Sequence, residues 1–360
     1  MTKITSIILF CITALVCLSA YTFTSRSKPV PYQFSYPGYF GNKIVLPDDN
    51  PATEQGVKLG RMLFYEPALS ANNKMSCSTC HQQKLAFTDG KRFSEGADGQ
   101  LQPRSTMALE NLLWVRHFFW DGRVEGLEQQ AGVPLTSEHE MGQSLTISAQ
   151  KLEEKGMYKQ LFVDAFGNDS ITGEKIIKAL AQFKRTLISA NAAYDKYLRK
   201  EYAPTQSELR GIGLFFGEME GGITKNAGCA HCHAGPKTFN ELFHNNGLDS
   251  TFNDVGREKV TGQQIDKGRF RVVSLRNIAL TAPYMHDGRF KTLAEVLDHY
   301  NDHIVSSLTL SPFLKTGPGD GTPQMLGLSS QDKQDLLAFL NMLTDSTFIT
   351  DKKFANPFNH

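Results

Sequence analysis

Hydrophobic residues recur every three or four positions in several parts of this chain, which is the spacing of helices. Two such stripes, over 176–187 and 336–343, consist of Ile176, Leu180, Phe183 and Leu187, and of Leu336, Phe339, Leu340 and Leu343. Such stripes are typical of the buried faces of helices. No sustained alternation of hydrophobic and polar residues, as in half-buried strands, is found. The pattern therefore predicts a mainly α fold.

A third helix begins at a capping box, and it belongs to a repeat. Thr205 and Glu208 have the spacing of such a box, ahead of a stripe made of Leu209, Ile212, Phe215 and Phe216. The pattern GxxLF, a polar loop and then CxxCH occurs at 60–81 and again at 211–233. We expect two helical domains over 51–200 and 201–345, a loop-rich lead-in over 21–50 and a tail over 346–360.

The two CxxCH motifs are the strongest chemical signal in the chain. They consist of Cys77, Cys80 and His81, and of Cys229, Cys232 and His233. Two cysteines three positions apart reach two vinyl-derived carbons on one edge of a porphyrin, and the next residue can bring its imidazole to the iron. The motifs therefore predict two covalently bound c-type haems, with His81 and His233 as iron ligands.

Two other kinds of site use cysteine pairs. A four-cysteine zinc site usually has its second pair within a few tens of residues, whereas Cys77 and Cys229 lie far apart in the sequence. A thioredoxin-like site requires a βαβ context, which neither flank has. Haem attachment is the interpretation that the spacing favours.

Composition and the N-terminus narrow the class of protein. The 360 residues are 40% hydrophobic and 21% charged, with a formal net charge of +1 and no basic run, which argues against nucleic acid as a partner. Residues 1–20 carry Lys3 ahead of a short apolar run, as in a secretory signal peptide, and an uncleaved membrane anchor is the alternative. Cys11 and Cys17 fall in this segment. We expect export to the periplasm, where c-type haem is attached.

Further motifs carry a family resemblance. They are the FFWDGR run at 118–123, the run EHEM at 138–141, and the run from Leu275 to Gly288. Together with the CxxCH motifs they resemble the bacterial di-haem cytochrome c peroxidases and their relative MauG, over nearly all of residues 50–345. The resemblance implies two cytochrome c-like helical domains, each around one c-type haem.

The resemblance also implies roles for single residues. His81 would ligate the peroxidatic haem in 51–200, and His233 the electron-transfer haem in 201–345. Trp120 matches the tryptophan between the two haems. Glu140 matches the distal glutamate that moves a proton during peroxide cleavage, and Gln130 a distal glutamine that orients peroxide. His139 is a weaker candidate beside Glu140.

Two departures concern the subfamily. Many di-haem peroxidases carry an iron-blocking histidine in the loop after the first motif, but 89–104 has none, and Ala97 falls near its position. The first haem is therefore expected to be open at rest. The sixth ligand of the second haem is usually methionine, whereas the register here falls on Tyr300, as in MauG; Met285, Met325 and His299 remain alternatives.

A calcium ion between the haems is a further expectation from the resemblance. Thr281 and Pro283 match the positions whose carbonyl groups bind it. The partner asparagine is replaced by Ser105. Loss of an amide carbonyl weakens a site for a cation that needs several oxygens, so occupancy stays open.

The expected function is the reduction of hydrogen peroxide to water. The electron donor would be a small cytochrome c or cupredoxin, and a homodimer is left open. One alternative is a MauG-like oxidase that removes electrons from a protein or organic substrate. The other is a non-enzymatic carrier of electrons with two closed haems, against which Glu140 and Gln130 argue.

Overall fold

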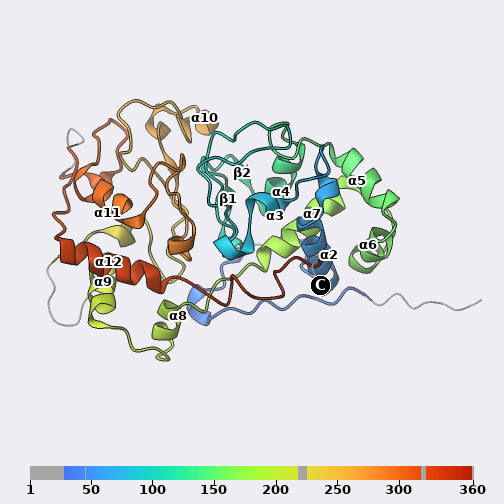
Figure 1. Ribbon diagram of the computed structural model, residues 1–360, viewed down its shortest axis with the longest axis horizontal. Coiled ribbons are helices and arrows are strands. Elements are labelled where there is room, and N and C mark those ends of the chain that lie inside the picture. The colour runs from blue at the N-terminus through green and yellow to red at the C-terminus, as the bar shows by residue number, and fades with distance from the viewer. Residues whose placement is uncertain (1–27, 45, 218–224, 318–321, 359–360) are drawn as a thin grey trace, which may run out of the picture.

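The computed structural model describes residues 28–44, 46–217, 225–317 and 322–358 and consists of two helical lobes (Figure 1). The predicted N-terminal signal or anchor at 1–20 lies outside the described residues. Among the described residues, no helix combines the length and apolar character that crossing a bilayer requires. The mainly α fold predicted from the hydrophobic spacing is confirmed.

Helices make up most of the regular structure in both lobes. The first lobe contains α2 (Glu54–Phe64), α3 (Cys77–Cys80), α4 (Leu127–Thr136), α5 (Leu145–Glu154), α6 (Tyr158–Phe166) and α7 (Gly173–Arg185). After it come α8 (Ala193–Leu198), α9 (Gln206–Phe216), α10 (Glu258–Thr261), α11 (Leu293–Asp302) and α12 (Ser330–Met342). The 3-10 turns are η1 (Gly38–Phe40), η2 (Pro67–Leu69), η3 (Gln83–Leu85), η4 (Leu112–Trp114), η5 (Cys229–His231), η6 (Gln264–Asp266), η7 (Ile278–Leu280) and η8 (Pro312–Leu314).

Strands are short and pair locally. β1 (His117–Phe118) pairs antiparallel with β2 (Val124–Glu125), and β3 (Phe243–His244) pairs antiparallel with β4 (Phe270–Arg271). The loop of the first hairpin carries Trp120. The backbone N–H of Arg271, in the second hairpin, donates a hydrogen bond to the Trp120 carbonyl oxygen at 2.7 Å. The two hairpins therefore meet where the lobes meet.

Each lobe is built on one pair of crossing helices. α2 packs on α7 in the first lobe, and α9 packs on α12 in the second. A Cβ at Gly60 would lie 1.9 Å from the Ala179 carbonyl oxygen, and one at Gly211 would lie 2.0 Å from that of Asp335. The shared glycine of the GxxLF motif thus lets the two helices touch backbone to backbone. The capping box predicted at Thr205 and Glu208 opens α9.

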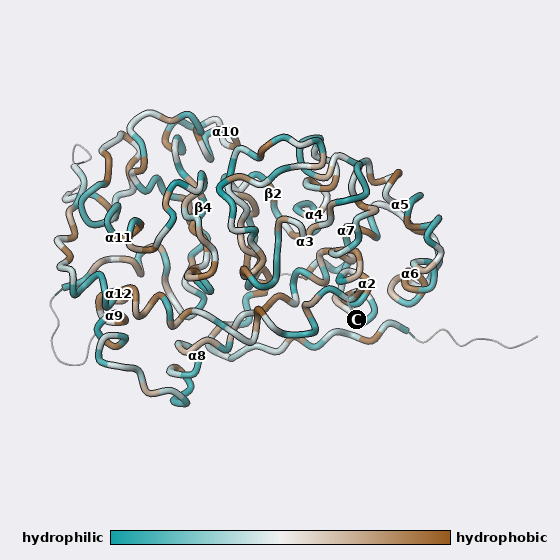
Figure 2. The backbone as a smooth tube through the Cα atoms, in the orientation of Figure 1, coloured by the Kyte–Doolittle hydropathy of each residue, from teal (hydrophilic) through white to brown (hydrophobic). Residues whose placement is uncertain are grey.

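Hydrophobic side chains fill three cores. One core surrounds α2 and α7 and another surrounds α9 and α12, and Figure 2 shows hydrophobic stretches toward the inside of each lobe. A third core joins the lead-in, the first lobe and the second lobe through Phe40, Trp114 and Phe239. In Figure 1 the chain after α12 returns to the first lobe, where Phe348 and Phe354 enter its core. The expected domain boundaries stay predictions.

Candidate active site

The first CxxCH motif is presented by one turn of helix. Cys77 and Cys80 are the first and last residues of α3, three positions apart, so they lie on the same side of the turn. His81 follows directly as the residue that ends the helix. The cysteines described in the structure form no disulfide. Burial raises the pKa of the Cys77 and Cys80 thiols to about 11.

Both candidate iron ligands are held in the tautomer that a metal requires. His81 Nδ1 lies 2.8 Å from the Phe87 carbonyl oxygen, and His233 Nδ1 lies 3.1 Å from that of Val273. A carbonyl oxygen only accepts, so Nδ1 carries the proton and Nε2 keeps its lone pair. Burial lowers the pKa of each imidazole to about 4, which keeps both neutral. These side chains fit a haem iron as the motifs predict.

One cavity brings the first motif together with the predicted peroxide residues. Its volume is about 110 Å³, and its walls include Cys77, His81, Gln130 and Glu140. Burial raises the pKa of Glu140, and the positive charge of Arg123 opposes that rise. A carboxyl group that holds its proton can donate it, as peroxide cleavage requires. His139 instead is exposed and pairs with Asp98 at 2.7 Å.

A second, larger cavity of about 1210 Å³ extends from this site into the space between the lobes. His81, Trp120, Gln130 and Glu140 line it from the first lobe, and Asp254 lines it from the second. The structure therefore brings Trp120, Gln130 and Glu140 to one cavity with His81, whereas the weaker candidate His139 does not line it.

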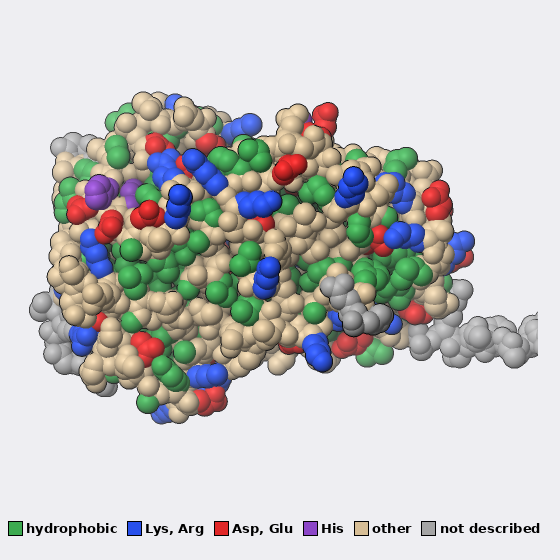
Figure 3. All heavy atoms as spheres, in the orientation of Figure 1, with side chains coloured by type: hydrophobic (Ala, Val, Ile, Leu, Met, Phe, Trp, Pro, Cys, Tyr) green, Lys and Arg blue, Asp and Glu red, His purple; other side chains and the backbone are tan. Residues whose placement is uncertain are grey.

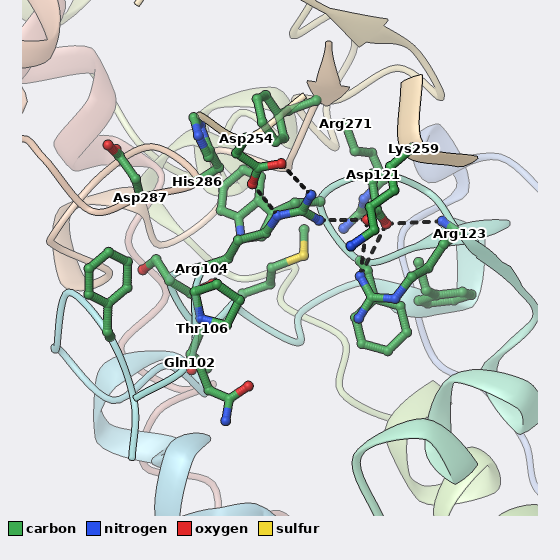
Figure 4. Close-up of a pocket in the computed structure, with 18 of the residues that line it drawn as sticks. Gln102, Arg104, Thr106, Asp121, Arg123, Asp254, Lys259, Arg271, His286 and Asp287 are labelled. Carbon is green, nitrogen blue, oxygen red and sulfur yellow. Dashed lines mark hydrogen bonds and ion pairs between the residues drawn. The ribbon is translucent and has the colours of Figure 1, made fainter. Parts of the chain in front are cut away.

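An ionic link crosses this cavity between the lobes. Arg104 Nε lies 2.6 Å from Asp254 Oδ2, and Arg104 Nη1 lies 2.7 Å from Asp121 Oδ2. Figure 4 shows Arg104 between these two carboxylates, with Arg123 on the far side of Asp121. Asp121 directly follows Trp120 in the chain. The link thus holds the Trp120 loop against the second lobe.

Trp120 lies beside a small inter-lobe cavity of about 80 Å³. Its indole Nε1 donates to the Ser105 carbonyl oxygen at 2.8 Å. The residues predicted for calcium, Ser105, Thr281 and Pro283, line the same cavity. So do Arg271 and Arg276, whose positive charges disfavour a cation. The carboxyl group of Glu110 lines the cavity as well, so the charges around it are of both signs, and calcium stays a prediction.

The second CxxCH motif lies near Tyr300. Burial raises the pKa of the Tyr300 phenol to about 12, and the neighbouring Cys232 and Cys229 act in the same direction. Asn246 Nδ2 donates to the Tyr300 oxygen at 3.4 Å and to the Met285 sulfur at 3.3 Å. Tyr300 and Met285 thus converge on one amide.

The other two alternatives for the sixth ligand are placed less suitably. Met325 is 59% exposed, unlike a ligand to a buried iron. His299 Nε2 lies 3.0 Å from the Asn246 carbonyl oxygen. This hydrogen bond uses the nitrogen that would otherwise ligate iron. The position of Tyr300 supports the sequence prediction, which remains a prediction.

Sequence reasoning missed two features of the site. Lys184 lines the smaller peroxide cavity, and Arg104 bridges the lobes. A signal for Lys184 was available, because it stands four positions after Leu180 on the hydrophobic stripe of α7. No comparable signal exists for Arg104, since its partner Asp254 lies in the other lobe.

Comparisons with known proteins identify the family of this chain. The sequence model of the di-haem cytochrome c peroxidase family matches residues 54–203. Over 301 residues the chain is 36% identical to the methylamine utilization protein MauG of Methylorubrum extorquens, covering 82% of this chain and 80% of that protein. Over 292 residues it is 33% identical to the cytochrome c551 peroxidase of Nitrosomonas europaea, covering 77% and 83%.

A solved structure is similar over almost the whole chain. It is a MauG-like protein associated with microbial copper homeostasis, with a TM-score of 0.79 and 34% identity, covering 91% of this chain and 99% of the other. The family binds two haems, in line with the two motifs found here. The chain belongs to the di-haem cytochrome c peroxidase family, which includes MauG, and is an oxidoreductase.

Proposed function

We propose that the protein reduces hydrogen peroxide to water at a haem attached to Cys77 and Cys80 and ligated by His81. The observation that carries the proposal is the single cavity shared by this motif, Gln130 and Glu140. A proton donor and an amide beside a candidate haem are what peroxide chemistry requires and what a simple electron carrier does not.

Side chains of the protein bind the peroxide and transfer a proton to it. The haem supplies the iron at which peroxide is reduced and accepts the electrons that this requires. Glu140, whose pKa is raised by burial, passes a proton to the departing oxygen of peroxide. Gln130 holds the peroxide by hydrogen bonds. Two electrons and two protons convert each peroxide into two waters.

Electrons are proposed to travel through the second lobe. A second haem, attached at Cys229 and Cys232 and ligated by His233 and Tyr300, would receive them from a small periplasmic cytochrome c or cupredoxin. Trp120, in the inter-lobe space, would connect the two haems. An exported location follows from the c-type attachment and from the N-terminal segment.

A second candidate function is a MauG-like oxidation of a protein or organic substrate. Tyr300 favours it, because a phenolate oxygen stabilises ferric iron and makes the second haem a weaker electron acceptor than methionine ligation would. The 36% identity to a MauG protein supports the same candidate. Both candidates share the peroxide step.

The peroxide step can be tested with matched variants. The purified protein should weigh two haems more than its polypeptide, and its oxidised form should react with stoichiometric peroxide without prior reduction. Glu140→Gln should slow that reaction about 10²- to 10⁴-fold with both haems still bound. Glu138→Gln, an exposed neighbour in the same turn, is the control and should react normally. A normal rate for Glu140→Gln rejects the proposed role.

A donor assay separates the two candidates. A reduced small cytochrome c or copper protein should be oxidised rapidly in the presence of peroxide if the protein is a peroxidase. Slow donor oxidation, together with oxidising equivalents that persist after peroxide is consumed, favours the MauG-like oxidase.

A further inference from the structure

A buried lysine lies in the wall of the proposed peroxide site. Lys184, near the end of α7, is 6% exposed and lines the cavity that contains His81 and Glu140. Its ammonium group donates a hydrogen bond to Oε1 of Gln130 on α4. The helices α4 and α7 pack against each other, so this contact joins two elements of the rigid framework.

The charge of Lys184 is not balanced by a neighbouring carboxylate. Among the described residues, no carboxylate oxygen lies within 4.0 Å of its ammonium nitrogen. The adjacent Arg185 forms the ion pair with Glu128, donating two hydrogen bonds of 2.6 and 2.7 Å to its carboxylate. A buried cation without an anionic partner is unfavourable, so a lysine at this position needs a reason other than stability.

The contact determines which way the Gln130 amide faces. An ammonium group has donors only, so the amide atom that meets it must be the oxygen. The Gln130 NH₂ group is then directed away from Lys184, leaving its two N–H donors for the cavity. Without Lys184 the amide could turn over and present an acceptor instead.

We propose that Lys184 is a positioning residue for peroxide reduction, which fixes Gln130 with its N–H donors toward the haem face and adds positive charge beside the bound peroxide. The inference rests on the proposed function and assigns a residue to the same site. Negative charge develops on the departing oxygen as the O–O bond breaks, and nearby donors and cations stabilise that charge.

The test uses ligands that report the distal pocket without turnover. Carbon monoxide on the reduced haem shows a lower C–O stretching frequency when a donor points at it, and fluoride on the oxidised haem binds more tightly beside donors and cations. Lys184→Met should raise the C–O frequency, and the rise should be smaller in a Gln130→Leu background, where only the positive charge of Lys184 is left to lose. Fluoride affinity should fall about 10- to 100-fold in Lys184→Met.

Lys178→Met is the control on the same helix, because the Lys178 ammonium pairs with Glu174 and Asp49. It should leave both readouts unchanged. If Lys184→Met alters only thermal stability, Lys184 is structural and the inference is wrong. If Lys184→Met does not fold, Lys184→Gln replaces it, and unchanged fluoride affinity in that variant overturns the inference. Absence of peroxide reduction in the unmodified protein would defeat the proposed function alone, because neither readout depends on turnover.

Discussion

Burial decides the protonation state of the groups that matter most at the residue scale. It lowers the pKa of His81 and His233 to about 4, so both imidazoles are neutral and can ligate iron. It raises the pKa of Glu140, so this carboxyl group holds its proton to a higher pH than an exposed glutamate does. Burial disfavours the charged form of each group, so it lowers the pKa of the two histidines and raises the pKa of the glutamate.

Substitution of Tyr300 tests the ligand of the second haem. Tyr300→Met should raise the reduction potential of that haem, because thioether ligation favours ferrous iron. Tyr300→Phe should change its low-spin absorption and magnetic resonance spectra. Met285→Leu is the comparison, since both side chains meet Asn246. If the spectra change in Met285→Leu but not in Tyr300→Phe, Met285 is the ligand of the second haem iron.

Glu110 should make stability depend on pH. Glu110 is 5% exposed, and its Oε2 finds no hydrogen-bond partner among the described residues. Burial raises its pKa from 4.5 to about 8. The folded protein therefore keeps this proton at pH values where the unfolded chain loses it. The free energy of unfolding should fall as pH rises from about 4.5 to about 8. Urea unfolding of Glu110→Gln across this range should show a smaller slope; an identical slope would contradict the assignment.

At the scale of elements, the repeat is a repeat of helix crossings. Gly60 on α2 and Gly211 on α9 occupy equivalent contacts, each against a backbone carbonyl of the partner helix. Phe183 and Phe339 lie at the same places on α7 and α12, near the two glycines. Each crossing supports the CxxCH motif that follows the glycine helix in the sequence.

Alanine at either glycine should destabilise its lobe. The new methyl group would have to push the two helix backbones apart, so Gly60→Ala and Gly211→Ala should each lose about 2 kcal/mol or more. Gly38→Ala is the control, because its Cβ meets nothing within 4 Å. Urea unfolding of the haem-loaded protein measures the loss. If both variants are as stable as the wild type, the helix pairs can move apart without loss of stability, and the prediction is wrong.

At the scale of the whole molecule, the chain ends tie the lobes together. The lead-in places Tyr39 against Asp195, which forms a fully buried ion pair with Arg276. The segment after α12 places Phe348 and Phe354 in the core of the first lobe. Figure 3 shows acidic, basic and hydrophobic side chains interspersed on one face, in keeping with the net charge of +1.

The first lobe should therefore depend on the C-terminal segment. Phe348→Ala should cost about 3 to 5 kcal/mol, as truncation of a buried phenylalanine does. The change should loosen the lobe of the N-terminal haem and perturb its spectrum first. Phe358→Ala, at a side chain 37% exposed, is the control. Equal effects of the two substitutions would show that the segment does not support the lobe.

The sequence alone determined the features that depend on residues close together along the chain. The helices were predictable because periodicity and capping boxes are local. Covalent haem attachment is predicted from five-residue motifs because its bonding geometry is local as well, and it stays a prediction. Glu140, Gln130 and Trp120 were predicted by resemblance, since nothing in their own surroundings distinguishes them from ordinary polar or core residues.

Only the tertiary structure decided the features that join distant segments. Lys184 meets Gln130 because α7 crosses α4, and Arg104 meets Asp254 because the two lobes dock. Glu110 has its raised pKa because segments from both lobes exclude water around it. The C-terminal segment enters the first lobe for a similar reason, since the hydrophobic surface that it covers is formed by other parts of the chain. Such contacts follow from packing in three dimensions, for which the order of residues carries no local signal.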